Sequence, residues 1–282
     1  MVGMRQVASA MTVAGSDSGG GAGVQADLKT FAALGVYGTS VLTAITAQNT
    51  RTVTAVHEIP IDIISAQIDA VVSDIGADSV KTGMLSSREI IECVTASLKD
   101  AEKKYPDMPG LRRLVVDPVM VAKSGDSLLR EEAVGSLRDL LLPMAAVVTP
   151  NIPETETLTG LTIVTDEDVR KAAQAIVAMG AASVVVKGGH REGPATDVYF
   201  DGRDFREFTA PRFETVNTHG TGCTFGLGGG RGTSQRTGSR GCCRAGQGVR
   251  YRGNPPLLPH RAGARASEPL LQTLAINGGS SK

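Results

Sequence analysis

Short apolar runs alternate along this chain with segments whose apolar residues recur at helical spacing. The runs are rich in β-branched residues, which favour strands, and they occupy residues 7–13, 36–47, 79–82, 114–116, 145–149 and 183–187. Helical spacing and helix-ending residues mark residues 24–34, 61–75, 87–98, 130–142 and 166–179. Strands that alternate with helices predict an α/β fold, in which helices cover both faces of a mostly parallel central sheet.

One late segment departs from this alternation. Residues 197–200 and 204–208 flank the pair Asp201-Gly202, which is typical of a type I′ hairpin turn. We therefore expect an antiparallel hairpin at one edge of the sheet.

The segments that end the predicted strands are polar or rich in glycine. In chain order they read GSD, AQN, KTGML, VDPVM, TPN and KGGH. In open α/β sheets, ligands bind at the carboxyl ends of the strands. The sequence therefore predicts a ligand site along this edge.

Composition excludes several classes of protein. Aromatic residues make up 4% of the 282 residues and tryptophan is absent, so an aromatic-rich recognition surface is not expected. No apolar run reaches the roughly 18 residues that a membrane span needs.

The four cysteines lack the C-x-x-C spacing of a zinc site, and unpaired Cys93 and Cys223 favour a reducing compartment. We expect a cytoplasmic protein, or a plastid protein if a transit peptide is missing from this sequence.

The composition changes abruptly after Phe225. Residues 226–282 contain 13 glycines, eight arginines and one lysine, against a single acidic residue, Glu268. This tail therefore carries a net charge of +8, and residues 1–225 carry −8, because the whole chain sums to zero. Arg/Gly-rich segments can bind nucleic acid or acidic lipid, but the only aromatic residue in the tail is Tyr251. We expect neither a nucleic-acid nor a membrane partner.

The glycine-rich turn at residues 15–23 has two interpretations. Gly21, Gly23 and Ala26 fit the relaxed dinucleotide-binding pattern G-x-G-x-x-G/A between a strand and a helix. That pattern also needs an acidic residue about 20 positions later, where this chain has Gln48 and Asn49. The dinucleotide interpretation is therefore disfavoured, and the absence of G-x-x-x-x-G-K-[ST] excludes a P-loop on pattern.

A second glycine motif, NTHGTGCT, occupies residues 217–224. If a helix begins here, its free N–H groups and dipole form an anion hole, and they lower the pKa of the Cys223 thiol. The alternative is a glycine-capped loop with a buried thiol.

Three further polar positions end predicted strands. Asn151 and Glu154 are three residues apart and would face one point if a helix starts after Pro153, which suits Mg²⁺ beside phosphates. The preference of helix N-termini for acidic residues explains the pair about as well. Asp117 could add charge near the same metal. Lys187 either neutralises a nucleotide phosphate or is a solvated strand end.

Taken together, these segments resemble one known family. GSDSGGGAGVQADLKTFAALGVYGTSVLTAITAQNT, VKTGML, VVDPVMVAKSGDSLL, LLPMAAVVTPNIPE, VVVKGGH and NTHGTGCT resemble, in order, the hydroxymethylpyrimidine and phosphomethylpyrimidine kinases of thiamine biosynthesis. The resemblance spans about residues 7–225, and DVYFDGRDFRE at residues 197–207 looks most like the kinase half of plant bifunctional thiamine enzymes. It implies the ribokinase-like fold, a three-layer α/β/α arrangement.

The resemblance also implies an activity and a site. The enzyme would phosphorylate 4-amino-5-hydroxymethyl-2-methylpyrimidine and then its monophosphate, with ATP and Mg²⁺, as a homodimer. By the same resemblance, the pyrimidine pocket comprises Gly15, Asp27, Gln48, Met84 and Val119. The catalytic residues are Gly220, Thr221, Gly222, Cys223 and Lys187. ATP is contacted by Asn151, Lys187 and Thr218, and the metal is bound by Asp117 and Glu154. Cys223 stands where related sugar kinases have an aspartate base, so we assign it to accepting the alcohol proton.

The tail departs from the family pattern. There the glycine motif opens a long apolar helix, whereas Gly226-Leu227-Gly228-Gly229-Gly230-Arg231 opposes helix formation, at about 1 kcal/mol for each glycine relative to alanine. We hypothesise that residues 226–282 come from a shifted reading frame or an aberrant splice, or that they are disordered. Two alternatives remain open: a pyridoxal kinase of the same fold, and a catalytically impaired remnant that still binds the pyrimidine.

Overall fold

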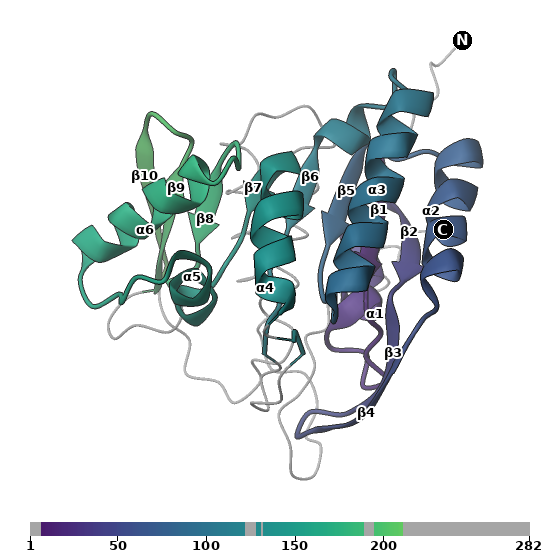
Figure 1. Ribbon diagram of the computed structural model, residues 1–282, viewed down its shortest axis with the longest axis horizontal. Helices are drawn as coiled ribbons and strands as arrows, with labels where there is room; N and C mark the ends of the chain where they lie inside the picture. Colours follow the sequence, from purple (N-terminus) through teal and green to yellow (C-terminus); the bar gives the residue numbers. More distant parts are fainter. Residues whose placement is uncertain (1–6, 122–127, 131, 189–194, 211–282) are drawn as a thin grey trace, which may run out of the picture.

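A central β-sheet organises the molecule. The computed structural model describes residues 7–121, 128–130, 132–188 and 195–210. Within these residues, eight strands pair in the order β10-β9-β8-β7-β6-β5-β1-β2 (Figure 1). Six are mutually parallel: β1 (Ser9–Ala14), β2 (Tyr37–Leu42), β5 (Ser79–Thr82), β6 (Leu114–Val116), β7 (Ala145–Val148) and β8 (Val184–Val186). The predicted parallel sheet is confirmed.

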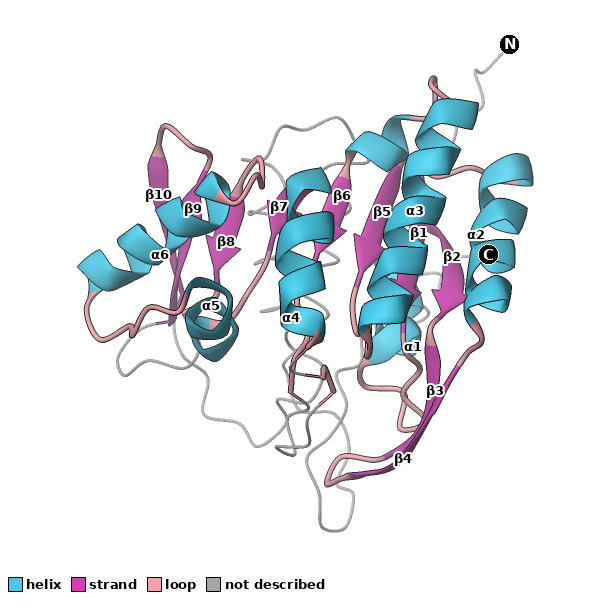
Figure 2. Cartoon of the chain, in the orientation of Figure 1, coloured by secondary structure: helices cyan, strands magenta, loops and turns pink. Residues whose placement is uncertain are grey.

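Helices cover both faces of this sheet. On one face lie α2 (Ile61–Asp74), α3 (Arg88–Lys104), α4 (Ala133–Ser136), α5 (Ile152–Thr159) and α6 (Asp166–Ala178), and on the other lies α1 (Gly23–Ala33) (Figure 2). A short 3₁₀ turn, η1 (Pro109–Arg112), precedes β6. The three-layer α/β/α prediction is therefore confirmed.

The alternation of side chains along β1 shows how the two faces are filled. Met11 and Val13 belong to the main apolar core, which includes Ile64 of α2 and Ile91 of α3. Ala10 points the other way and packs with Phe31 of α1. The two faces therefore have separate apolar clusters, as expected for a sheet buried on both sides.

The predicted strand at residues 36–47 is two strands. The chain leaves the central sheet at Thr43, whose N–H donates to the Ala14 carbonyl at 3.1 Å and whose hydroxyl donates to the Met84 carbonyl at 2.9 Å. It continues as β3 (Ala44–Gln48), which pairs antiparallel with β4 (Val53–Glu58) in a separate sheet. This hairpin projects below the carboxyl ends of the strands in Figure 1. Sequence analysis missed β4 because most of its residues are exposed and lack an alternating pattern.

The late hairpin consists of β9 (Ala195–Phe200) and β10 (Phe205–Ala210), which are antiparallel as predicted. The predicted type I′ turn is wrong. Four residues connect the strands, because the Asp201 carboxylate accepts the N–H groups of Arg203 at 3.1 Å and Asp204 at 2.8 Å. This side-chain acceptor stabilises a wider loop than the two-residue turn that Asp-Gly favours.

The helix predicted at residues 130–142 is only partly regular. After α4 the chain forms a π-helical turn, Leu137–Leu141, and then a 3₁₀ turn, Leu142–Met144. In this arrangement Leu137, Leu141 and Leu142 are all buried in the main core. Packing therefore overrides the regular helical spacing here. In contrast, α2 begins directly after Pro60, as predicted.

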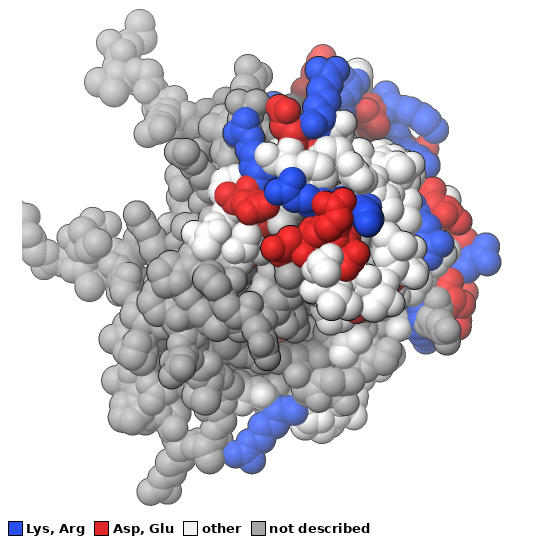
Figure 3. Space-filling model, turned by 90° about the vertical axis from the view of Figure 1, so that its left-hand side faces the viewer, with Lys and Arg blue, Asp and Glu red and all other residues white. Residues whose placement is uncertain are grey.

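The described surface carries mixed charge. In the view of Figure 3, acidic and basic side chains lie next to one another over the described part of the face. Arg170 of α6 and Glu207 of β10 form one such pair, at 2.7 Å. None of the described helices is both long and apolar enough to cross a bilayer.

Two glycines with positive φ provide a test of the turn that precedes α1. Alanine at Gly23 (φ +56°) would place its Cβ 2.4 Å from the Gly15 carbonyl oxygen, whereas alanine at Gly35 (φ +69°) would meet no atom within 4 Å. We expect Gly35→Ala to lower the free energy of unfolding by about 1 kcal/mol, and Gly23→Ala by roughly 3 kcal/mol or more. Urea unfolding measures both. Equal losses would contradict the close approach at Gly23.

Candidate active site at the carboxyl edge of the sheet

The polar segments that follow the parallel strands meet at one edge. Their backbones continue the sheet pairing beyond the strands: the Asp117 N–H donates to the Thr82 carbonyl at 3.0 Å, and the Lys187 N–H donates to the Pro150 carbonyl at 2.8 Å. Asn151 and Lys187 form a parallel bridge. The segments after β5, β6, β7 and β8 are thus brought level with one another, as the sequence predicts.

The glycine-rich turn after β1 is organised around Asp17. This buried carboxylate accepts the N–H groups of Gly19 at 2.8 Å, Gly21 at 2.9 Å and Ala22 at 2.7 Å. The N–H groups that would hold a pyrophosphate in a dinucleotide-binding turn are therefore already bonded to Asp17. The structure agrees with the sequence argument against a dinucleotide site.

Three of the predicted pyrimidine-pocket residues are close to this turn. A Cβ added to Gly15 would lie 3.1 Å from the Met84 sulfur, so the two residues are in contact. Gln48, at the end of β3, is tied to the turn because its N–H donates to the Ser18 hydroxyl at 2.8 Å, and that hydroxyl donates to the Gln48 carbonyl at 2.6 Å. Gly15, Met84 and Gln48 thus lie around the same turn. The role of Ser18 had no signal in the sequence.

Val119 lies beside the second polar cluster. Its N–H donates to the Asp117 carbonyl at 2.8 Å, directly after β6, and its side chain is partly exposed. Its predicted contact with the pyrimidine stays a prediction.

Asp27 occupies a different kind of position from the other pocket residues. It is fully buried on α1, where it forms an ion pair with Lys81 of β5 at 2.9 Å and accepts a hydrogen bond from Thr12. Burial raises the pKa of the Asp27 carboxyl, while Lys81 and Thr12 oppose that rise. Asp27 therefore lies beneath the edge rather than on its surface, and its contact with a substrate stays a prediction. Lys81 was missed, although a lysine inside the strand SVKT is a visible anomaly.

A second polar cluster joins the ends of β6, β7 and β8. The Lys187 ammonium donates to Asp117 Oδ1 at 2.8 Å, and the Thr149 hydroxyl donates to the same oxygen at 3.2 Å. All three residues are buried. Lys187 is therefore not a solvated strand end.

Asn151 and Glu154 form a capping box at the start of α5. The Asn151 side chain accepts the Glu154 N–H at 2.9 Å, and the Glu154 carboxylate accepts the Asn151 N–H at 2.7 Å. Helix α5 begins at Ile152, one residue before Pro153, which is acceptable because the first turn needs no N–H there. Capping therefore accounts for the spacing of the pair.

Glu154 nevertheless belongs electrostatically to the second cluster. Its burial raises the pKa of its carboxyl from 4.5 to about 7, the nearby Lys187 ammonium opposes the rise, and the Asp117 carboxylate adds to it. Two carboxylates and one ammonium thus share a buried volume. Near neutral pH the Glu154 carboxyl is partly protonated, and a cation that binds there would displace that proton.

A magnesium ion held by these residues stays a prediction. No group of three His, Cys, Asp or Glu side chains suited to a metal occurs in the described parts of the chain. Mg²⁺ commonly binds through one or two carboxylates, with substrate phosphates and water completing its shell. Asp117 and Glu154 would provide two such carboxylates, whereas the Asn151 amide oxygen already accepts the Glu154 N–H.

The remaining predicted catalytic positions, and one predicted ATP contact, Thr218, lie outside the described residues. The catalytic positions are Gly220, Thr221, Gly222 and Cys223. Their roles stay predictions.

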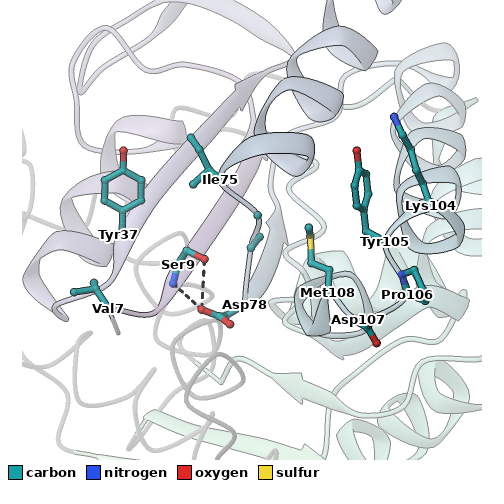
Figure 4. A pocket seen from close by; sticks show the side chains of 12 residues that line it. Val7, Ser9, Tyr37, Ile75, Asp78, Lys104, Tyr105, Pro106, Asp107 and Met108 are labelled. Carbon is teal, nitrogen blue, oxygen red and sulfur yellow. Dashed lines mark hydrogen bonds between the residues drawn. The ribbon is translucent and has the colours of Figure 1, made fainter. Parts of the chain in front are cut away.

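Two pockets of the described structure bear on where the site lies. One, of about 470 Å³, lies between β4 and Met84. Its wall includes Glu58, which accepts the Ser86 hydroxyl at 2.8 Å and pairs with Arg130 at 3.3 Å. The other, of about 760 Å³, lies at the opposite edge between Tyr37, Asp78 and Tyr105 (Figure 4). Only the first adjoins the converging segments. The larger pocket is therefore not the candidate active site.

The comparisons with known proteins agree with this architecture. The family model described as phosphomethylpyrimidine kinase matches residues 17–227. A hydroxymethylpyrimidine/phosphomethylpyrimidine kinase of Rhizobium meliloti is 55% identical over 219 residues, covering 77% of this chain and 79% of the relative. A chloroplastic thiamine biosynthetic bifunctional enzyme of Arabidopsis thaliana is 50% identical over 224 residues, covering 78% of this chain and 41% of that longer protein.

A solved structure gives the same fold. The crystal structure of an ADP complex of Bacillus subtilis pyridoxal kinase has a TM-score of 0.77 and 36% identity, covering 86% of this chain and 90% of that chain. Fold and site together define a ribokinase-like α/β kinase. Within that class, the chain belongs to the phosphomethylpyrimidine kinase family, as the sequence motifs indicate.

The raised pKa of Glu154 predicts a pH effect on stability. Because the folded-state pKa of about 7 exceeds the ordinary value of 4.5, the folded protein binds this proton more tightly than the unfolded chain does. The free energy of unfolding should therefore fall as pH rises from 4.5 to 7, by about 3 kcal/mol from this group. Glu154→Gln should remove this contribution, as urea unfolding across that range would measure. Parallel pH profiles for the two proteins would contradict the raised pKa.

Proposed function

We propose that this protein transfers phosphate from ATP to the hydroxymethyl group of 4-amino-5-hydroxymethyl-2-methylpyrimidine, and then to the resulting monophosphate. Relatives that are half identical in sequence carry the corresponding names, and the neighbour in complex with ADP supports a nucleotide donor. The observation that carries the proposal is that two groups lie at the same edge of the sheet: the Gly15, Met84 and Gln48 group, and the Asp117, Lys187 and Glu154 cluster.

The first group suits a neutral aminopyrimidine. The Gln48 amide can both donate to and accept from the edge of the ring. Met84 offers a polarisable apolar surface to the ring face, and the absence of a side chain at Gly15 leaves the approach open. The partly exposed Val119 would add apolar contact from the segment that follows β6.

The second group suits the phosphates. Lys187 and Asp117 neutralise each other in the described structure, so a magnesium ion and an anionic phosphate would each gain one partner of this pair. Asp117 and Glu154 would hold the ion, while Asn151, Lys187 and Thr218 would contact the nucleotide. Bound magnesium would spread the charge of the transferring phosphoryl group.

The catalytic step is assigned to the motif at residues 217–224. Backbone N–H groups of Gly220, Thr221 and Gly222 would stabilise the developing charge, and Cys223 would accept the proton of the attacking alcohol.

The match to the family model ends at Leu227, two residues beyond the end of the predicted kinase domain at Phe225. We propose that residues 1–225 form this domain, as a homodimer, and that residues 226–282 arise from a shifted frame or an aberrant splice. The coding DNA tests the last point, since a frame that restores an apolar helix after Phe225 is expected.

A coupled assay of ADP release tests the activity. With the full chain, we expect turnover with the hydroxymethylpyrimidine and its monophosphate to exceed turnover with pyridoxal. Gln48→Ala should raise KM for the pyrimidine about tenfold or more, since one buried hydrogen bond is lost, with little change in KM for ATP. Faster turnover of pyridoxal would favour the pyridoxal kinase alternative. Pyrimidine binding without ADP release would indicate the impaired remnant.

Substitution of Cys223 tests the proton acceptor. We expect Cys223→Ser to lower kcat by about 10² or more, because general-base assistance typically contributes 10² to 10⁴. KM for the pyrimidine should change little. Unchanged turnover would remove Cys223 from this role.

A further inference from the structure

A lysine lies inside the central sheet, on the face that α1 covers. Lys81 of β5 is in register with Thr12 of β1 on one side and with Val115 of β6 on the other. Val115 is in register with Val147 of β7, and all four residues are buried. A cation therefore occupies a position where the adjacent strand β6, and β7 beyond it, each place valine.

The partner of this lysine is Asp27. The Lys81 ammonium, on a side chain that is 1% exposed, donates to both carboxylate oxygens, at 2.9 and 3.2 Å. Asp27 is completely buried and is also held by Thr12. Desolvation of two charges commonly cancels most of their attraction, so a buried ion pair is often no more stabilising than an apolar pair of the same size. Stability alone is therefore a weak reason for this pair.

The ammonium also contacts the backbone that leads to the candidate pocket. A Cβ added to Gly83 would lie 2.8 Å from Lys81 Nζ and 3.0 Å from the Ala14 Cβ. Gly83 precedes Met84, and Ala14 precedes Gly15. The residues that directly precede Gly15 and Met84 therefore pack together, and one of them, Gly83, lies against the Lys81 ammonium.

We infer that Lys81 is a positioning residue for the pyrimidine pocket. Through Asp27 it ties α1 to β5, and it thereby fixes how closely Gly15 approaches Met84. Lys81 itself touches no substrate. This inference deepens the proposed function and rests on it.

A double-mutant cycle tests the inference with the full chain. The variants are Lys81→Met, Asp27→Asn and the double substitution, with Lys104→Met as the control, because Lys104 pairs with Asp69 on the exposed surface. We expect each single variant to raise KM for the pyrimidine about tenfold while KM for ATP stays unchanged. If Lys81 acts through Asp27, the double variant should show no larger effect than either single variant. Two results would overturn the inference. One is a KM increase in the double variant equal to the product of the two single increases, and the other is an unchanged KM for the pyrimidine in single variants that fold.

A second measurement does not depend on activity. The ¹³C-methyl NMR signal of Met84 should shift in the double variant and stay in place in Lys104→Met. The double variant removes both charges, so it should fold even if Lys81→Met alone does not. An unmoved Met84 signal in the folded double variant would overturn the inference. Absence of pyrimidine turnover in the unsubstituted protein would instead overturn the proposed function, while the methyl signal would still test the link between Lys81 and the pocket wall.

Discussion

Backbone pairing that continues past the ends of the parallel strands is the constraint on which the rest of this structure depends. The N–H groups of Gly83, Asp117 and Thr149 each donate to a carbonyl of the neighbouring strand, at 3.0, 3.0 and 2.9 Å. Residues that follow different strands are therefore held at one level, although they are far apart in the chain. A parallel sheet makes this arrangement obligatory, because every strand ends at the same edge. The candidate site is a consequence of that geometry more than of any single residue.

Charge is distributed beneath this edge in two buried clusters. One pairs Lys81 with Asp27 below the side proposed for the pyrimidine. The other pairs Lys187 with Asp117 on the side proposed for the phosphates, with Glu154 nearby. The two clusters interact electrostatically, since the negative charge of Asp117 contributes to the raised pKa of the Asp27 carboxyl. The first cluster is closed to solvent, which suits a role in fixing the position of the nearby backbone at Gly83. The second contains a carboxyl with a pKa of about 7, which suits the exchange of a proton for a cation.

Prediction from sequence succeeded where local pattern and tertiary packing demand the same conformation. Residues 79–82 and 114–116 are strands with the predicted bounds, because short apolar runs in a parallel sheet are buried on both faces. It failed where a side chain or the core intervened. Gln67 bonds both backbone groups of Leu42, at 2.9 and 3.1 Å, where β2 ends and the chain leaves the sheet. Asp201 widens the late hairpin, and the burial of Leu137, Leu141 and Leu142 accompanies the π-helical and 3₁₀ turns that follow α4.

The sequence by itself determined the alternation of strands and helices, the polar segments after the strands and the family, because each of these is recorded in residues that are neighbours in the chain. Only the tertiary structure decided which charges neutralise one another. Lys81 and Asp27 are 54 positions apart, and Lys187 and Asp117 are 70 positions apart. The pairing of such distant groups depends on strand order and register, which bring particular side chains onto the same face of the sheet. For this reason Asp27 could be predicted as a pocket residue while its partner Lys81 was missed.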